Sequence, residues 1–559
     1  MEVWKLSGQT IQANIAGAGL AGLSAAITLA RSGIACRLIS MLPSERAQSV
    51  LAEGGINGAL NTMGEDDSPA RHFEDTMKAG GYIADADAVK GLTDHAPQIL
   101  LELKRMGAAF NLQDETIQLR NFGGQKKKRT AYARSSTGKI LMTTLIDEAR
   151  KYEAAGLIVR SSHHELTDLL IRDGRCLGLV IKDLYTDQPE LMYGPVILAT
   201  GGLSGFFPYI TTGSVTNTGN ASALAFARGV RFSNLEMIQY HPTTFSIAGK
   251  RCLISEAARG EGGRLFSYRD GKPWYFMEER YPELGNLMPR DVVSREIFYV
   301  THYKEPGTQT WELKPGSSSV FLDLRHLDKS VWMKKLPDLR EEILHYAGID
   351  PAKEPVPVEP GIHYFMGGID VDQEHRTNIQ GLFAAGECCS QYHGANRLGG
   401  NSTMAAIYGG KVAAKSLAAQ LGRYPETKDQ IRQQVGSINE ACAFQTGSVY
   451  VSELSLQIRD ILLPAMGIIR NAETLLAALD HLQKLSEKDS FTFPEKKRFL
   501  LAEAMLRSAL CRKESRGAHF REDHPEADAR FKGKTISCFD PGEEQVSVGI
   551  QLVGNGNSI

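Results

Sequence analysis

A glycine-rich turn between two apolar strands is the strongest constraint in this sequence. Residues 11–16 and 34–40 read as strands, and the helix between them begins at a turn with the spacing G-x-G-x-x-G, formed by Gly17, Gly19 and Gly22. In a βαβ unit of about 30 residues, this spacing is the fingerprint of a dinucleotide-binding fold. The glycines let backbone amides at the start of the helix approach a pyrophosphate. The sequence therefore predicts an α/β fold that begins with a Rossmann-like unit.

Two later segments, residues 195–202 and 381–387, also read as apolar strands that end in glycine turns. Buried strands of an unrelated α/β sheet would look similar, but the pattern favours one dinucleotide-binding domain that is interrupted by an insertion. The insertion reads as an α+β capping domain, and leucines at three-to-four-residue spacing predict a helical domain after it. The predicted boundaries are 1–238 and 361–421 for the two parts of the dinucleotide-binding domain, 239–360 for the capping domain and 422–559 for the C-terminal helical domain.

Composition excludes several classes of protein. A chain of 559 residues and 61.2 kDa exceeds the size of a single hydrophobic core, and it contains no run of 18 apolar residues that could span a bilayer. With 63 basic and 65 acidic residues the net charge is −2, which argues against binding to nucleic acid. The eight cysteines form no Cys-x-x-Cys pair, so no iron-sulfur or other metal site is predicted. The N-terminus lacks the pattern of a secretory signal, which predicts a cytoplasmic protein.

Several short stretches combine histidine, arginine and glutamate with glycine in a way that packing does not require. They are AEGGIN at 52–57, QYHPT at 239–243, SEAARGEGG at 255–263, PRD at 289–291, GIHYFMGG at 361–368, HGANRLGGNS at 393–402 and ESRGAH at 514–519. Together, and in this order, they closely resemble the flavoprotein subunit of succinate dehydrogenases and fumarate reductases, in the form found in Gram-positive bacteria. The resemblance runs essentially from end to end. It implies FAD as the cofactor, a capping domain over the flavin and a small dicarboxylate, fumarate or succinate, as the substrate.

The resemblance assigns four side chains to the two carboxylates of this substrate. His363 and Arg397 would bind one carboxylate, and His241 and Ser255 would bind the other. A forked guanidinium holds a carboxylate through two hydrogen bonds, and the same donors stabilise the charge that accumulates as hydride arrives. Ser255 stands where relatives usually have threonine, which keeps the hydroxyl.

The resemblance also assigns the proton donor, which would be Arg290. Arginine is normally a very weak acid. A nearby Arg259 would make Arg290 a better donor through like-charge repulsion, and Glu256 could pass a proton between them, which gives a relay to solvent. The alternative for Arg259 and Glu256 is a structural ion pair.

A larger set of residues is placed at the flavin by the same resemblance. Ser40 stands where the fingerprint usually has an acidic residue, so its hydroxyl would bind the ribose less strongly. Glu387 follows a strand end and suits a ribose hydroxyl, with a surface carboxylate as the alternative. The implied flavin residues are Gly17, Gly19, Gly22, Ser40, Ser49, Ala52, Gly54, Gly55, Gly201, Glu387, Arg397 and Ser402.

Two other features are interpreted as structural. The adjacent Cys388 and Cys389 are expected to be packing residues, because neighbouring cysteines form a disulfide only with strain. The basic run at residues 126–129 is expected to be a solvated loop.

Phe122 separates two candidate substrates. L-aspartate oxidase is a relative with much of the same active site, and at this position it has a glutamate that meets the substrate ammonium. Phe122 offers no negative charge, and burying an unpaired ammonium is costly, so the sequence favours an unaminated dicarboxylate. Reduction of another α,β-unsaturated acid stays open. A non-enzymatic electron-transfer or scaffold subunit with a vestigial site is the alternative from a different class.

The family resemblance also predicts a partner. Its members receive or deliver electrons through an iron-sulfur protein subunit, and this chain lacks cysteine-ligand spacing of its own. We therefore expect an iron-sulfur partner in a complex that can be anchored to the membrane, with this chain on the cytoplasmic face. An NADH-linked partner and a quinone complex stay open as electron sources, as does the physiological direction of the reaction.

Gln48 predicts how the flavin is attached. Most respiratory members bind FAD covalently through a histidine five residues before the Glu-Gly-Gly motif, and Gln48 occupies that position. Glutamine cannot form the histidyl bond, so we expect FAD to be bound non-covalently. The covalent link helps to keep the flavin potential high enough to oxidise succinate, so its absence favours fumarate reduction.

Acid precipitation should release all yellow colour into the supernatant, and flavin fluorescence that stays with the denatured protein band would contradict this prediction.

Overall fold

The computed structural model describes residues 11–134, 136–214, 216–247, 249–305, 308, 311–314, 319–423, 451–487, 491 and 493–553. Its centre is a parallel sheet with the strand order β23-β12-β1-β2-β8. This order confirms the predicted βαβ unit and shows that both later strand-then-glycine segments join the same sheet. The strands span Ala13–Ala16 (β1), Cys36–Ser40 (β2), Ile158–Ser162 (β8), Val196–Leu198 (β12) and Leu382–Ala384 (β23).

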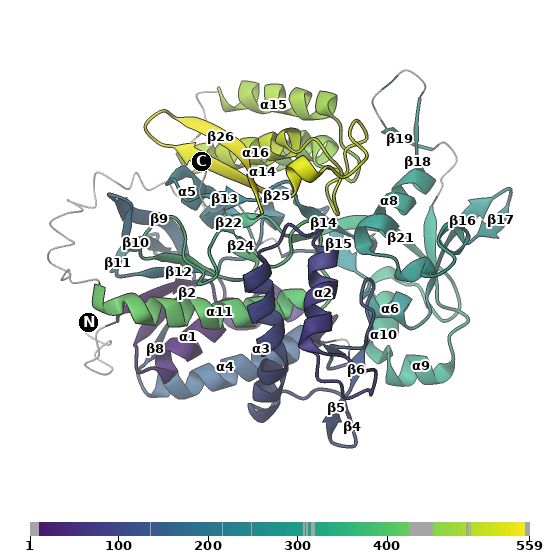
Figure 1. Ribbon diagram of the computed structural model, residues 1–559, viewed down its shortest axis with the longest axis horizontal. Coiled ribbons are helices and arrows are strands. Elements are labelled where there is room, and N and C mark those ends of the chain that lie inside the picture. The colour runs from purple at the N-terminus through teal and green to yellow at the C-terminus, as the bar shows by residue number, and fades with distance from the viewer. Residues whose placement is uncertain are drawn as a thin grey trace.

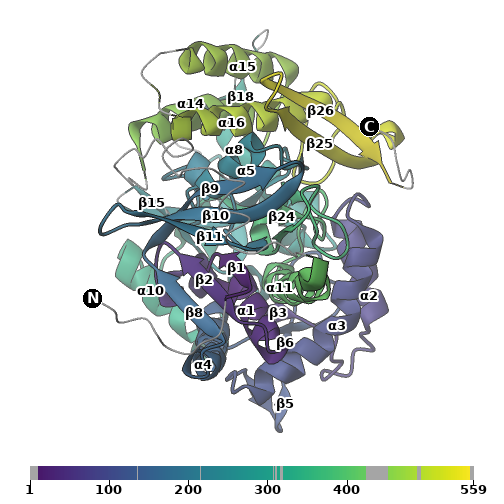
Figure 2. The same cartoon turned by 90° about the vertical axis from the view of Figure 1, so that its left-hand side faces the viewer.

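Helices cover one face of this sheet, and a three-stranded antiparallel sheet, β11-β10-β9, lies on the other side (Figures 1 and 2). Helices α1 and α11 approach each other through small residues, since a Cβ added to Gly410 would lie 2.2 Å from the carbonyl oxygen of Ala21. This close contact holds the start of α1 against the middle of α11. These elements span Leu20–Arg31 (α1), Ala86–Arg105 (α3), Thr137–Ala154 (α4), Asn401–Gln420 (α11), His164–Arg172 (β9), Arg175–Asp183 (β10) and Pro189–Tyr193 (β11).

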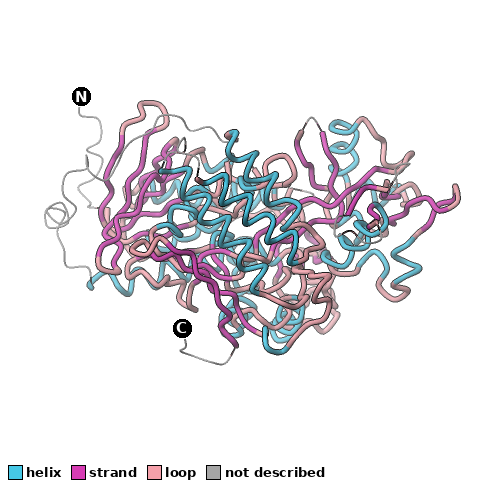
Figure 3. Tube along the Cα trace, turned by 90° about the horizontal axis from the view of Figure 1, so that it is seen from above, coloured by secondary structure: helices cyan, strands magenta, loops and turns pink. Residues whose placement is uncertain are grey.

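The residues predicted as a capping domain form a lobe at one end of the molecule (Figures 1 and 3). Its six-stranded sheet has the order β15-β14-β21-β20-β16-β17 and encloses an apolar core of its own. The long strands β14 and β21 pair antiparallel and run through the two predicted domain boundaries. The main elements are β14 (Ile238–Ile247), β15 (Lys250–Leu253), α6 (Ala257–Gly260), β16 (Arg264–Arg269), β17 (Lys272–Trp274), α8 (Arg290–Thr301), β20 (Val320–Asp323), α9 (Lys329–Lys334), α10 (Pro337–Ala347) and β21 (Val356–Phe365).

The C-terminal part is helical where the leucine spacing predicts it, and it then ends in a hairpin that the sequence analysis did not predict. Helices α14 (Glu453–Ala465), α15 (Ala472–Ser486) and α16 (Phe493–Cys511) pack together. Strands β25 (Gly533–Asp540) and β26 (Gln545–Leu552) extend a sheet that also contains β13 (Phe232–Ser233), β22 (Gly368–Asp370) and β24 (Cys389–Ser390). The hairpin therefore joins the C-terminal part to the flavin-side residues (Figure 2). None of the described helices is long and apolar enough to cross a membrane.

The basic run at residues 126–129 is a loop, as we expected, but its solvation does not extend to its last residue. Its last member, Arg129, is fully buried and donates to Asp67 at 3.1 and 2.9 Å, with Asp75 2.9 Å away. Lys128 agrees with the expectation, because its side chain is exposed and forms an ion pair with Glu65 at the surface. A run of like charges in the sequence does not show that two acidic residues from another segment lie against one of its members.

This buried cluster predicts a large loss of stability when its cation is removed. Arg129→Met would leave the buried carboxylates of Asp67 and Asp75 without their cation, which costs about 3–5 kcal/mol. Lys128→Met removes only a surface ion pair, worth at most about 1 kcal/mol. We expect the apparent melting temperature to fall clearly for the Arg129 variant and to stay near the native value for the Lys128 variant. Equal melting temperatures for the two variants would contradict the assignment.

Candidate functional site

One long pocket runs from the start of α1 to the capping lobe, among the residues that the structure describes. It gathers side chains from distant segments because the carboxyl ends of the parallel strands open at the same edge. All the predicted flavin residues line it except Gly22, which lies behind Gly17: a Cβ on Gly22 would stand 1.8 Å from the Gly17 carbonyl oxygen. The predicted flavin residues on its wall are Gly17, Gly19, Ser40, Ser49, Ala52, Gly54, Gly55, Gly201, Glu387, Arg397 and Ser402.

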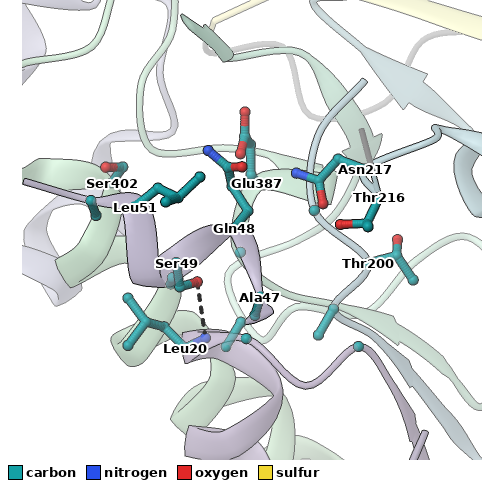
Figure 4. A pocket seen from close by; sticks show the side chains of 18 of the residues that line it. Leu20, Ala47, Gln48, Ser49, Leu51, Thr200, Thr216, Asn217, Glu387 and Ser402 are labelled. Carbon is teal, nitrogen blue, oxygen red and sulfur yellow. Dashed lines mark hydrogen bonds between the residues drawn. The ribbon is translucent and has the colours of Figure 1, made fainter. Parts of the chain in front are cut away.

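The glycine turn leaves room only for backbone. Gly17 has φ +113°, and a Cβ there would lie 2.0 Å from the carbonyl oxygen of Ala199. Ser49 closes the turn, because its Oγ accepts from the backbone N of Leu20 at 3.3 Å (Figure 4). The amides at the start of α1 therefore face the pocket, where they can meet a phosphate.

The pocket wall also carries buried polar atoms that have no partner among the residues that the structure describes. These include Oγ1 of Thr200, Nδ2 of Asn217 and Oε2 of Glu53. Buried polar groups normally find a hydrogen-bonding partner, so donors and acceptors on a pocket wall fit a ligand with many polar atoms. The glycine turn, the helix start and these atoms together fit a dinucleotide.

Glu387 lies in the middle of this wall and is no surface carboxylate (Figure 4). Its Oε1 accepts from the backbone N of Phe365 at 3.1 Å, and burial raises its pKa to about 7. The neighbouring Cys388 and Cys389 donate to backbone carbonyls, and burial raises the pKa of Cys388 to about 11. Both cysteines are free thiols, which agrees with a packing role.

Gln48, at the position of the histidine in covalent relatives, also points into this pocket (Figure 4). Its Oε1 accepts from the backbone N of Ser214. The side chain therefore satisfies a backbone donor, and its amide carries no nucleophile for a bond to flavin.

At the other end of the pocket, two histidines face each other. His241 lies on β14 and His363 on β21, with ring centroids 5.2 Å apart. Burial, with Arg290 nearby, lowers the pKa of both rings well below the ordinary value, so both are neutral at pH 7. Thr212 contacts Nδ1 of His363 at 2.8 Å, which leaves Nε2 free to meet a ligand. Oγ of Ser255 is buried on the same wall and has no hydrogen-bond partner within the described ranges.

The three predicted relay residues form a continuous chain of contacts. Arg290 donates to Oε2 of Glu256 from Nη2 at 2.6 Å and from Nε at 3.1 Å, and Arg259 donates to Oε1 at 3.0 Å. Although burial alone would raise it, the two guanidinium groups hold the pKa of Glu256 below its ordinary value. Arg290 and Glu256 line the pocket, whereas Arg259 lies behind Glu256 and donates to the backbone O of Asn286 at 2.7 Å.

Arg397 connects the two ends of the pocket. Its Nη1 donates to Ser402 at 3.1 Å, and its guanidinium lies over the ring of Tyr364, 4.3 Å from the centroid. Its Nε has no partner in the described part of the chain. Burial, with Arg290 nearby, lowers the pKa of Arg397 to about 9. Such a group gains much from an anionic ligand, because the anion restores the solvation that burial removed.

The sequence analysis missed Gln239, which stands behind this site. Its Oε1 accepts from Nη1 of Arg290 at 2.9 Å and from Nη2 of Arg397 at 3.0 Å. Gln239 stands two residues before His241 in the stretch at 239–243, and this position could have indicated a role at the site. Thr212 was also missed, and no pattern in its own segment pointed to it.

Phe122 lines the pocket and is 2% exposed. It packs with the apolar core of the capping lobe, and its ring lies against Gly54 and Gly399. This contact places an uncharged, apolar ring close to Glu256 and Arg290, which also lie against Gly399.

Comparisons with known proteins agree with this geometry. The family described as FAD binding domain matches residues 14–403, and the one described as fumarate reductase flavoprotein C-term matches residues 495–555. The chain is 39% identical to the succinate dehydrogenase flavoprotein subunit of Bacillus subtilis, over 92% of this chain and 91% of that protein. It is 34% identical to the fumarate reductase flavoprotein subunit of Escherichia coli, over 95% of this chain and 92% of that protein.

A solved structure is similar over the whole chain. A variant of the quinol fumarate reductase of Escherichia coli matches with a TM-score of 0.84 and 30% identity, over 98% of this chain and 97% of that chain. The α/β flavin-binding architecture with a capping lobe and a C-terminal part is therefore confirmed. The chain belongs to the family of succinate dehydrogenase and fumarate reductase flavoprotein subunits, and it is an FAD-dependent oxidoreductase.

Proposed function

We propose that this chain reduces fumarate to succinate, and that the same site supports the reverse oxidation. The observation that carries the proposal is the contact chain Arg290–Glu256–Arg259, which reaches the pocket between His241, His363 and Arg397. A carboxylate between two buried arginines is the arrangement that a proton relay needs, and the pocket beside it carries the donors that a dianion needs.

The donors suit two carboxylates at opposite ends of a short chain. His363 and Arg397 would bind one, and His241 and Ser255 the other, in line with their places on the pocket wall. The neutral imidazoles can donate from Nε2, and Ser255 has a hydroxyl without a partner. Burial makes each of these contacts stronger than it would be in water.

Reduction of the double bond needs a hydride and a proton. FAD, once reduced, supplies the hydride to one carbon of the double bond. Arg290 would donate the proton to the other carbon, and Glu256 and Arg259 would return a proton to it. As hydride arrives, negative charge grows on the nearer carboxylate, and Arg397 stabilises it without reorganising.

Phe122 supports an unaminated substrate. Its ring offers no negative charge at the wall where a substrate ammonium would need one, so L-aspartate is disfavoured. Another α,β-unsaturated dicarboxylate would use the same donors. A vestigial site in a scaffold subunit is disfavoured, because the relay residues are in contact and the carboxylate donors line the same pocket.

The electron partner that we propose is an iron-sulfur protein subunit. The relatives are named as flavoprotein subunits, which supports assembly with other chains. Through such partners, this chain would lie peripherally at the cytoplasmic face of a membrane. Isolation of the protein from its source cells, followed by identification of the chains that co-purify, tests the partner.

The first test of the function compares two substrates. With a reduced dye as electron donor, the FAD-loaded chain should consume fumarate. With oxygen as acceptor, it should oxidise L-aspartate much more slowly, because Phe122 cannot pair with the ammonium. Aspartate oxidation as fast as fumarate reduction would assign the chain to the oxidase instead.

The second test separates the proton donor from the binding groups. Arg290→Gln removes a proton that is needed only in the transition state, so kcat should fall by about 10² or more while KM changes less. Arg397→Gln removes a contact made with both the substrate and the transition state, so KM should rise as well. Arg269→Gln, which removes an exposed arginine of the capping lobe, is the control and should keep native values. Native fumarate turnover in the Arg290 variant would show that the proton comes from elsewhere.

A further inference from the structure

We propose that the hydrogen bond between Asp291 and Asn396 is the positioning contact that aligns the proton donor Arg290 with the substrate-binding Arg397. Asn396 donates from Nδ2 to Oδ1 of Asp291 at 2.6 Å, across 105 residues of sequence. Each partner is the immediate neighbour of one of the two arginines. The inference deepens the proposed function and rests on it.

Asn396 is the centre of a small closed network. Its Oδ1 accepts from Nε2 of Gln239 at 2.7 Å and from the backbone N of Arg397 at 3.0 Å. Gln239 in turn accepts from the guanidinium groups of both Arg290 and Arg397. Asp291, Asn396 and Gln239 thus tie the start of α8, the loop before α11 and strand β14 around the two arginines.

The arginines need such a restraint because they repel each other. Both donate to the same oxygen of Gln239, so two like charges are held close together in a buried place. A neutral amide can bridge them but cannot cancel their charge. The Arg290 side is held by α8 in the capping lobe, whereas the Arg397 side is held by the loop of the flavin domain. The Asp291–Asn396 bond links those two segments through the side chains that adjoin Arg290 and Arg397.

The chemistry of this bond is directional. Asn396 is 5% exposed and uses its amide N as the donor to Asp291 and its amide O as the acceptor from Gln239 and Arg397. Arg295, one turn further along α8, is the cation that faces Asp291. A carboxylate at position 396 would still accept from Gln239 and Arg397, but it could not donate to Asp291. The two carboxylates would also repel each other. Exchange of the two residues would restore one donor and one acceptor.

This directionality gives a rescue experiment on the FAD-loaded full chain. The variants are Asn396→Asp, Asp291→Asn and the double exchange, compared by kcat and KM for fumarate with a reduced dye. Malonate, a dicarboxylate without a reducible double bond, is titrated against the flavin absorbance to measure binding separately. Gln373→Glu is the matched control, because Gln373 also donates an amide N–H to a carboxylate, Asp87, at 3.1 Å, but at an exposed place outside the pocket.

Asn396→Asp should lower kcat by about tenfold or more, since small misplacements of a catalytic group have large effects on rate. The dissociation constant of malonate should change by less than about threefold, because each arginine is still present. The double exchange should return kcat to within about threefold of the native value, and Gln373→Glu should have no effect. If the contact only stabilised the fold, Asn396→Asp would lower the melting temperature but would not lower kcat selectively while the dissociation constant of malonate stays nearly the same.

Several results would overturn the inference. Native kcat in Asn396→Asp would do so, as would a double exchange that is as slow as the single variant. If Asn396→Asp fails to retain FAD, the double exchange decides: an active, FAD-loaded protein supports the positioning role, and a slow or flavin-free one refutes it. The proposed function is tested independently by the native chain, whose failure to reduce fumarate would refute that function whatever the variants do.

Discussion

Three buried guanidinium groups arranged around one buried carboxylate are the constraint on which the rest of the site depends. Arg259 and Arg290 contact Glu256 directly, and Arg397 contributes to its lowered pKa. Each charge loses solvation on burial, and one carboxylate cannot compensate three cations. The chain compensates the excess with fixed neutral acceptors, of which Gln239 and the backbone O of Asn286 are the clearest. The remaining positive charge faces the pocket, where a dianion can balance it.

The fold solves this problem by supplying the charges from separate lobes. Strands β14 and β21 pair across the boundary of the capping lobe and carry one histidine each into the pocket. Helix α8 brings Arg290 from the capping side, and the loop before α11 brings Arg397 from the flavin side. Because neither lobe holds the full set, the site exists only when the two are aligned.

The sequence predicted those parts that local patterns encode. The glycine turn after β1 follows from chain geometry alone, since only glycine fits at Gly17, and the leucine spacing located α15 correctly. That β12 and β23 belong to the same domain as β1 could be inferred because each strand ends in its own glycine turn, whereas their order in the sheet comes from the structure. The residues His241, His363, Arg290 and Arg397 came from a resemblance rather than from local physics. Their convergence on one pocket agrees with that resemblance, and their roles stay proposals.

What the sequence did not predict depends on partners that lie far apart in the chain. Arg129 looked like the end of a solvated basic run, because nothing in residues 126–129 shows that Asp67 and Asp75 lie against it. Gln239 and Asn396 carry no charge, so the sequence pattern gave neither of them a role in catalysis or binding. The hairpin β25–β26 has its partner strand, β13, some 300 residues earlier, so its place in the sheet is set by tertiary contacts.

The same charge arrangement couples substrate binding to alignment of the lobes. A fumarate dianion between His241 and Ser255 on one side and His363 and Arg397 on the other would bridge the capping lobe and the flavin side of the chain. Without the dianion, repulsion between Arg290 and Arg397 acts to separate those parts, and the amides of Gln239 and Asn396 oppose it. With the dianion in place, the repulsion is offset at the moment when the proton donor must be close. Binding energy from the carboxylates is thereby used to hold the geometry that the proton transfer needs, which is the condition under which binding raises kcat as well as affinity.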